Sequence, residues 1–375
     1  MASERDIRIR PMEKCEKKKV YSLMKHSFPL IQQLFFSFTS KVFVAEKDGA
    51  LQGAIVLKTF YLSKKRKIGL LYWGFVHPEA RGEGVGRLLY DAGIRILEEE
   101  KCTEILGCIE GHNTSSSNLL ASRGFDILSP GAQLKRFGLH TFFLWLHIFH
   151  YLDIGHFLWA RPTTGKKDSP VLQWWGTLLL SGTLITLSRL FLAKSSPAAV
   201  ALFLALLSLF GFRYLAMKGT AFFMGLNVRF RAWESGFFLF FVLSLFVPGI
   251  LYPVSGGLYP DKNKWHYTQE LPCLGPIAFA GVLSLLFLIG SSAILCHLLS
   301  SWAPGTLMGQ TFSSQWVNLL NDTLRYITSY GKTFLLFDAL FIFFPFTCFN
   351  GRRIWDWNKP VWVGTALTTM LAIFS

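Results

Sequence analysis

The spacing of apolar and polar positions divides the chain into two halves. Through residue 136, short apolar runs alternate with charged and turn residues, whereas later residues fall in long runs of Leu, Phe, Val and Ala. Alternation with a period of two is typical of a half-buried strand, and three- to four-residue spacing is typical of an amphipathic helix. The first half therefore predicts an α+β domain. Its expected strands are 6–10, 41–46, 51–62, 69–76, 103–110 and 125–128, and its expected helices are 11–25, 83–100 and 114–123.

The second half predicts membrane-spanning helices, which need about 17–25 apolar residues each. About six runs qualify, with five or seven left open: 173–193, 197–217, 236–257, 274–298, 334–350 and 360–375. This predicts an all-α polytopic membrane domain over 169–375. Residues 137–159 are aromatic but contain four histidines and an aspartate, so we expect a helix at the membrane interface within a linker over 137–168. The alternative is a true first span.

Composition and charge support an integral membrane protein. Of the residues, 51% are hydrophobic, which is too apolar for two soluble domains of this length. The net charge of +15 is spread along the chain and near the ends of the apolar runs, which favours anionic headgroups over nucleic acid. No apolar stretch opens the sequence, so we expect the domain 1–136 to face the cytosol. The six cysteines form no Cys-x-x-Cys pair, so we expect no zinc site. The sequence does not identify the membrane.

A glycine-rich turn after an apolar strand is the strongest chemical signal. Residues 74–89 pass from a strand through Gly82, Gly84 and Gly86 into a helix. Glycines let the backbone N–H groups approach a ligand closely, and the helix N-terminus adds the positive end of its dipole. The turn therefore predicts a site for a pyrophosphate group.

The pattern Arg81-x-x-Gly84-x-Gly86, followed by Asn113 and later by Gly124-Phe125, resembles the GNAT N-acetyltransferase superfamily over residues 5–136. The resemblance implies acetyl-CoA as cofactor, with a pantetheine arm along the strand 71–76. It also implies an oxyanion contact from a backbone N–H near Phe75 or Val76. The cofactor-binding residues are then expected to be Phe75, Val76, Arg81, Gly82, Glu83, Gly84, Val85, Gly86 and Asn113.

An amine must lose a proton before it attacks a thioester, so a base is expected near the cofactor. Glu110, at the end of its strand, and His112 are the candidates; a merely solvated carboxylate is the open alternative for Glu110. Many GNAT proteins carry a general-acid Tyr where this chain has Leu120. Another donor (Tyr72, Tyr90 or Ser117) or water could replace it, or the domain binds CoA without rapid turnover. The acceptor amine is not identified.

Short segments of the second half resemble the site-2 protease family of intramembrane metalloproteases. These are Phe230-Arg231-Ala232-Trp233, Gly275-Pro276 and residues 344–351. The resemblance puts Arg213, Tyr214, Met217 and Asn350 at the metal-site positions, where zinc would need His and carboxylate ligands. It therefore implies a protease scaffold that has lost its metal.

Asp338 is an ionisable residue inside an apolar run. We expect it to pair with Arg213 or Arg189, a substrate role being the alternative. Two hypotheses follow for the whole chain: a membrane-anchored N-acetyltransferase acting on a primary amine, or a non-catalytic CoA-binding membrane protein.

Overall fold

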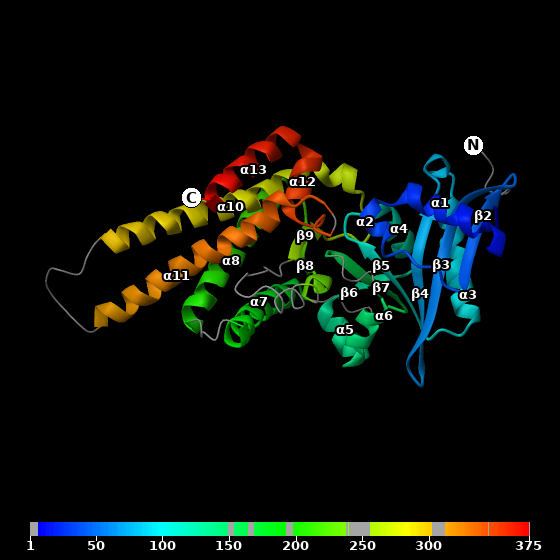
Figure 1. Ribbon diagram of the computed structural model, residues 1–375, viewed down its shortest axis with the longest axis horizontal. Helices are drawn as coiled ribbons and strands as arrows, with labels where there is room; N and C mark the ends of the chain where they lie inside the picture. The colour runs from blue at the N-terminus through cyan, green and yellow to red at the C-terminus, as the bar shows by residue number, and fades with distance from the viewer. Residues whose placement is uncertain are drawn as a thin grey trace. The chain divides into compact units, whose positions relative to one another are not determined.

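The computed structural model describes residues 7–148, 154–163, 169–192, 198–237, 239, 256–301, 312–343 and 345–374 (Figure 1). The chain divides into two compact units. The first comprises residues 1–151 and 156–167, and the second comprises 152–155 and 168–375.

The first unit is built on a seven-stranded sheet with the order β1-β2-β3-β4-β5-β7-β6. Only β4 and β5 pair in parallel; the other neighbours are antiparallel. The six strands expected from the sequence are all present. The strands are β1 (Arg8–Pro11), β2 (Lys41–Lys47), β3 (Ala50–Ser63), β4 (Arg66–Val76), β5 (Glu104–Glu110), β6 (Asp126–Leu128) and β7 (His156–Arg161).

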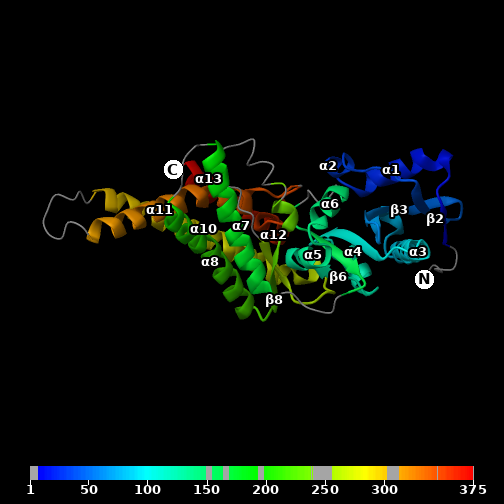
Figure 2. The ribbon, with the colours of Figure 1, turned by 90° about the horizontal axis from the view of Figure 1, so that it is seen from below.

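Helices cover both faces of this sheet, and Figure 2 shows α1 and α3 on opposite sides of it. Met24 of α1 and Leu144 of α6 lie in the core on one face. On the other face α3 approaches so closely that a Cβ on its Gly93 would lie 2.9 Å from Ile55 Cδ1. The helices are α1 (Lys17–Ser27), α2 (Leu30–Gln33), α3 (Val85–Glu99), α4 (Thr114–Ala121), α5 (Pro130–Phe137) and α6 (His140–His147), with 3₁₀ turns at Lys14–Glu16 and Pro78–Ala80.

The structure differs from the sequence prediction over residues 137–168. The expected interfacial helix is shortened to α6, and the segment after it forms β7, which lies between β5 and β6. The strand forms because its residues 157–160 are buried on both faces of the sheet. The sheet of the first unit therefore extends past the predicted boundary at residue 136. Residues 149–153 and 164–168 of the predicted linker lie outside the described residues.

The second unit is mostly helical, and its helices α8, α10 and α11 pack around a common apolar core (Figure 1). A two-stranded antiparallel ribbon, β8 with β9, accompanies them. The elements are α7 (Pro170–Leu192), α8 (Ala199–Phe223), β8 (Val228–Ala232), β9 (Gly256–Pro260), α10 (Tyr267–Ser301), α11 (Phe312–Leu335), a π-helical turn (Leu336–Leu340), α12 (Asn350–Trp357) and α13 (Lys359–Phe374).

Three described helices are long and apolar enough to cross a membrane: Pro170–Leu190, Ala199–Phe223 and Tyr267–Leu299. The described residues do not support six spans. The expected span 236–257 lies largely outside them. The expected span 334–350 is wrong, because the helix ends in the π-helical turn that contains buried Asp338. The last expected span is α13, an apolar helix of 16 residues, slightly shorter than a bilayer requires.

Candidate functional site

An opening between β4 and β5 is the main feature of the first unit. The two strands pair only where residues 68–71 face residues 104–107, although β4 continues to Val76 and β5 to Glu110. At the same point β4 shifts register against β3, which leaves Tyr72 as an extra, bulged residue. A bulge bends its strand locally. The facing edges of β4 and β5 beyond this point are therefore not joined by a ladder.

The direction of the β4 peptide groups follows from their pairing with β3. The N–H of His77 donates to Gln52 O on β3 at 2.8 Å. Since alternate residues of a strand present their peptide groups to opposite edges, Phe75 also faces β3 and Val76 faces the opening. Consistently, Val76 O accepts a hydrogen bond from Ser27 Oγ of α1 at 3.5 Å. Of the two predicted oxyanion contacts, Val76 has the suitable direction.

The glycine turn has the backbone that the sequence predicted. Gly82 and Gly84 have φ values of +89° and +85°, in the left-handed region that favours glycine. The first α-helical bond of α3 is donated by Leu88 to Gly84 O at 3.1 Å. The N–H groups of Val85 and Gly86 therefore precede the helical bonds, as in any helix first turn.

Gly86 is not required by protein packing. A Cβ at this position would meet Leu119 Cδ1 at 3.6 Å and Val76 Cγ2 at 3.7 Å, which are ordinary contacts. The missing side chain instead keeps the start of α3 bare on the side of β4 and α4.

The two charged residues of the turn differ in their surroundings. Arg81 is exposed. Glu83 forms an ion pair with Lys47 of β2 at 2.8 Å, and its N–H donates to Ala80 O at 3.4 Å. The contribution of Glu83 to an anion site is thereby reduced, whereas the guanidinium of Arg81 is available at the surface.

The start of α4 forms the other wall of the opening. Asn113 caps this helix, since its Oδ1 accepts the N–H of Ser116 at 3.2 Å, as expected for a helix-starting Asn. Leu120 is fully buried, and its Cδ1 would lie 3.0 Å from a Cβ on Gly107 of β5. Leu120 therefore has a packing role where many GNAT proteins carry a tyrosine.

The two predicted bases lie at the end of β5. Glu110 is the last residue of the strand, and His112 follows in the turn, where its carbonyl accepts the N–H of Thr114 at 2.8 Å. Strand alternation places Glu110 on the same face as Leu106, which belongs to the core under α1 and α6. The opposite face carries the contact between Gly107 and α4.

The sequence reasoning missed His156 as a neighbour of the site. In the pairing of β5 with β7, His156 lies directly opposite Glu110. A signal was present: the apolar run 157–160 is bounded by Gly155 and Pro162, which is typical of a short buried strand. The aromatic segment before this run obscured it.

The three alternative proton donors occupy different places. The hydroxyl of Tyr90 on α3 would lie 3.3 Å from a Cβ on Gly74 of β4, and it is hydrogen-bonded to Ser116 of α4. Burial raises the pKa of Tyr90. Ser117 Oγ bonds to Thr114 O, and the hydroxyl of Tyr72 contacts Ser37 Oγ at 3.2 Å. Only Tyr90 thus brings a hydroxyl from α3 to β4 and the start of α4.

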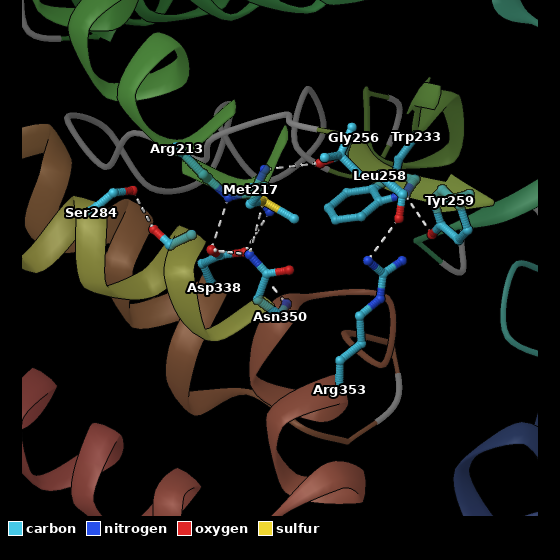
Figure 3. Close-up of polar contacts among 11 residues, drawn as sticks. Arg213, Met217, Trp233, Gly256, Leu258, Tyr259, Ser284, Asp338, Asn350 and Arg353 are labelled. Atoms are coloured by element: carbon cyan, nitrogen blue, oxygen red, sulfur yellow. Dashed lines mark hydrogen bonds and ion pairs between the residues drawn. The ribbon is translucent and has the colours of Figure 1, made fainter. Parts of the chain in front are cut away.

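The second unit contains a buried polar centre, shown in Figure 3. Arg213 of α8 donates two hydrogen bonds to Asp338, from Nε at 2.9 Å and from NH2 at 2.8 Å. The Nδ2 of Asn350 donates to Asp338 Oδ2 at 2.8 Å, and Arg213 NH1 donates to Gly256 O of β9 at 3.2 Å. The predicted pairing of Asp338 with Arg213 is confirmed, whereas Arg189 contacts the hydroxyl of Tyr326.

Three of the positions derived from the site-2 protease resemblance converge in this centre. Arg213 and Met217 lie one turn apart on α8, and Asn350 Nδ2 is 3.6 Å from Met217 Sδ. The fourth, Tyr214, instead packs against Trp174 and Phe230. Within the described part of the chain, no three His, Cys, Asp or Glu side chains gather as a metal site.

The comparisons with known proteins agree with the geometry of the first unit. Residues 6–125 match the model of the acetyltransferase (GNAT) family. The N-terminal part of the chain is thus a GNAT-type domain, as the resemblance over residues 5–136 implied, and this agrees with acetyl-CoA as its cofactor. The match does not extend to the second unit. A search of curated proteins found no match.

Several solved structures are similar to part of the chain. An N-acetylglutamate synthase from Neisseria gonorrhoeae, complexed with coenzyme A and N-acetyl-glutamate, is 20% identical with a TM-score of 0.33 and covers 43% of this chain and 36% of its own. The NatC complex bound to Gag peptide and CoA is 19% identical, with a TM-score of 0.31 and coverages of 42% and 99%. A ribosomal-protein-alanine N-acetyltransferase from Brucella melitensis is 21% identical, with a TM-score of 0.26 and coverages of 32% and 86%.

Proposed function

We propose that this chain is a membrane-anchored N-acetyltransferase that transfers the acetyl group of acetyl-CoA to a primary amine on the cytosolic side. The observation that carries this proposal is the bare glycine turn at the start of α3, next to an opening between β4 and β5, in a GNAT-type domain. The three apolar helices of the second unit would anchor the domain to a bilayer.

The turn would hold the pyrophosphate of acetyl-CoA. The N–H groups of Gly82, Gly84, Val85 and Gly86 and the dipole of α3 supply the positive field, and exposed Arg81 adds a full charge. Asn113 keeps the start of α4 in place on the far wall. The free edge of β4 next to Val76 offers peptide groups to the amides of the pantetheine arm.

The residues around the opening fit acetyl transfer. Bound acetyl-CoA supplies a thioester, whose carbonyl carbon forms a bond to the amine nitrogen while its C–S bond breaks. Glu110 accepts the proton that the amine loses, with His112 as the alternative base. The N–H of Val76 donates a hydrogen bond to the carbonyl oxygen as negative charge develops there. Tyr90, whose pKa is raised by burial, is the best-placed donor of a proton to the departing sulfur.

The test uses aspartate substitutions at two matched glycines in the full chain. Gly86 and Gly131 both occupy the second position of a helix, in α3 and α5, and both have room for a Cβ. An aspartate in a helix first turn interacts favourably with the dipole, so both variants should fold. Gly86→Asp places a negative charge at the pyrophosphate site and should weaken acetyl-CoA binding by about 100-fold or more, measured by calorimetry. Gly131→Asp should leave binding unchanged.

A second candidate function is a non-catalytic CoA-binding membrane protein built on an inactive site-2 protease-like scaffold. It is favoured by the convergence of Arg213, Met217 and Asn350. Release of CoA thiol with a panel of primary amines separates the two candidates. Turnover that Gly86→Asp abolishes supports the enzyme, and CoA binding without turnover supports the scaffold. Absence of CoA binding by the wild-type chain contradicts both.

A further inference from the structure

A short helix, α2, has flanking aromatic residues that pack against the separated end of β4, on the face of the sheet that carries α1. Phe28 precedes α2 and Phe36 follows it. The ring of Phe28 lies 5.1 Å from that of Trp73 and 6.0 Å from that of Phe75, and the ring of Phe36 lies 5.6 Å and 5.9 Å from the same two. Trp73 and Phe75 belong to the part of β4 that has separated from β5. These contacts fix α2 beside the opening.

The outer side of α2 is apolar and in contact with water. Leu30 and Leu34, one turn apart, are 80% and 81% exposed, and Ile31 between them is 46% exposed. Exposed apolar side chains gain free energy when a hydrocarbon covers them. Apolar surface therefore continues from the rings on β4 to the outside of the domain.

The charges around this surface argue against a polycationic acceptor. Residues 17–38, which include α1 and α2, contain four lysines and no Asp or Glu. Lys25 lies over the ring of Tyr21, and Lys17 lies over that of Phe38. A polyamine would be repelled here, whereas an amine with an apolar body would not.

We propose that the acceptor is a primary amine carried on a long hydrocarbon chain, and that this chain lies along Leu30 of α2 and Leu34, the residue that ends this helix. The inference rests on the proposed acetyltransferase function and names its substrate class. The three apolar helices in the same chain would hold the enzyme where lipid amines are concentrated. Both a single-chain alkylamine and an aminophospholipid carry a primary amine together with long hydrocarbon chains.

The test compares amines that differ in their hydrocarbon portion, using the full chain in detergent micelles and release of CoA thiol. Butylamine, dodecylamine and phosphatidylethanolamine are the three acceptors. The wild type should prefer dodecylamine or phosphatidylethanolamine to butylamine, and the preferred one identifies the source of the amine. The double variant Leu30→Ser, Leu34→Ser should raise the KM for the long-chain amine about tenfold, with the KM for butylamine unchanged.

Tyr61→Ser is the matched control. Tyr61 is also an exposed apolar residue, at 68%, but it pairs with Lys67 at the far end of β4 from the opening, so its removal should change neither KM. Equal rates with all three amines, or an undiminished chain-length preference in the double variant, would overturn this inference and leave the acetyltransferase proposal intact. No CoA release with any amine would instead contradict the acetyltransferase proposal.

Discussion

The opening in the first unit and the polar centre in the second both bring together polar groups from distant parts of the sequence. The two places differ in whether these groups form hydrogen bonds with one another. At the opening, the N–H groups of Val76, Val85 and Gly86 lie at a strand edge and at a helix start, where no ladder or helical bond takes them. In the centre, the guanidinium of Arg213, the carboxylate of Asp338 and the amide of Asn350 are bonded to one another.

This difference separates a place suited to a ligand from a place suited to holding elements together. Backbone donors at a surface opening keep their hydrogen-bonding capacity for a phosphate or a carbonyl oxygen. The buried centre instead joins α8, β9, the π-helical turn and α12 through one carboxylate and one guanidinium. In such a low-dielectric surrounding, each charged group depends on its partner.

The largest expected effect is in the centre. Asp338 is fully buried, so Asp338→Ala leaves the charge of Arg213 uncompensated and should destabilise the second unit by about 3–5 kcal/mol. Replacing both partners by apolar residues, Arg213→Met with Asp338→Leu, should recover much of this loss. The measurement is the melting temperature of the full chain in detergent, arranged as a double-mutant cycle.

The control for that cycle is an exposed ion pair in the first unit. Arg95 and Glu99 on α3 approach to 3.9 Å with about two-thirds of each side chain exposed, and Glu99→Ala should change stability by no more than about 0.5 kcal/mol. If Asp338→Ala lowers the melting temperature no more than Glu99→Ala does, the buried ion pair stabilises the protein no more than the exposed pair, which contradicts this prediction.

An intermediate effect is expected at the opening, on rate and not on stability. Glu110→Gln keeps the shape of the side chain but removes the base, and should lower kcat by about 100-fold at neutral pH with acetyl-CoA affinity unchanged. The difference in kcat between the wild type and Glu110→Gln should become smaller as pH rises toward the pKa of the amine, because an amine that is already neutral needs no base. His112→Gln tests the alternative base. Full activity in Glu110→Gln together with a loss in His112→Gln would reassign the role to His112.

The features that the sequence predicted are the local ones. The strands 41–46 and 51–62 are short apolar runs on either side of a turn at residues 47–50, and the glycine turn carries its backbone requirement in its own residues, so these features could be predicted without the fold. β7 was missed because the expected interfacial helix over residues 137–159 includes most of its apolar run 157–160. The facing of Glu110 and His156 was missed because it depends on a pairing across 46 positions of the chain. Two arginines were acceptable partners for Asp338, and only the packing of α8 against α11, which leads into the π-helical turn, selected Arg213.

The smallest expected effect concerns a partly exposed arginine cluster in the first unit, the counterpart of the buried centre. Arg10 donates to both oxygens of Glu16 at 2.7 Å and 2.8 Å and to Glu46 at 2.6 Å. The hydrogen bonds from Arg10 lower the pKa of Glu16 from 4.5 to about 2. The resulting stabilisation is therefore complete above the unfolded-state pKa and is lost as pH falls from about 4.5 toward 2. Glu16→Gln should lower stability by less than about 1 kcal/mol at pH 7, measured by the melting temperature at a series of pH values.

The pH series sharpens the comparison, because near pH 2 about half of the native Glu16 carboxyl groups are protonated and most of the stabilisation by Arg10 is lost, so the wild type should approach the Glu16→Gln variant. Asp338→Ala loses stability because it breaks a buried ion pair. Glu16→Gln loses less stability because water can replace the hydrogen bonds that the Glu16 carboxylate makes. A difference between wild type and Glu16→Gln that persists unchanged at pH 2 would show that packing of the Glu16 side chain, and not its charge, stabilises the start of α1.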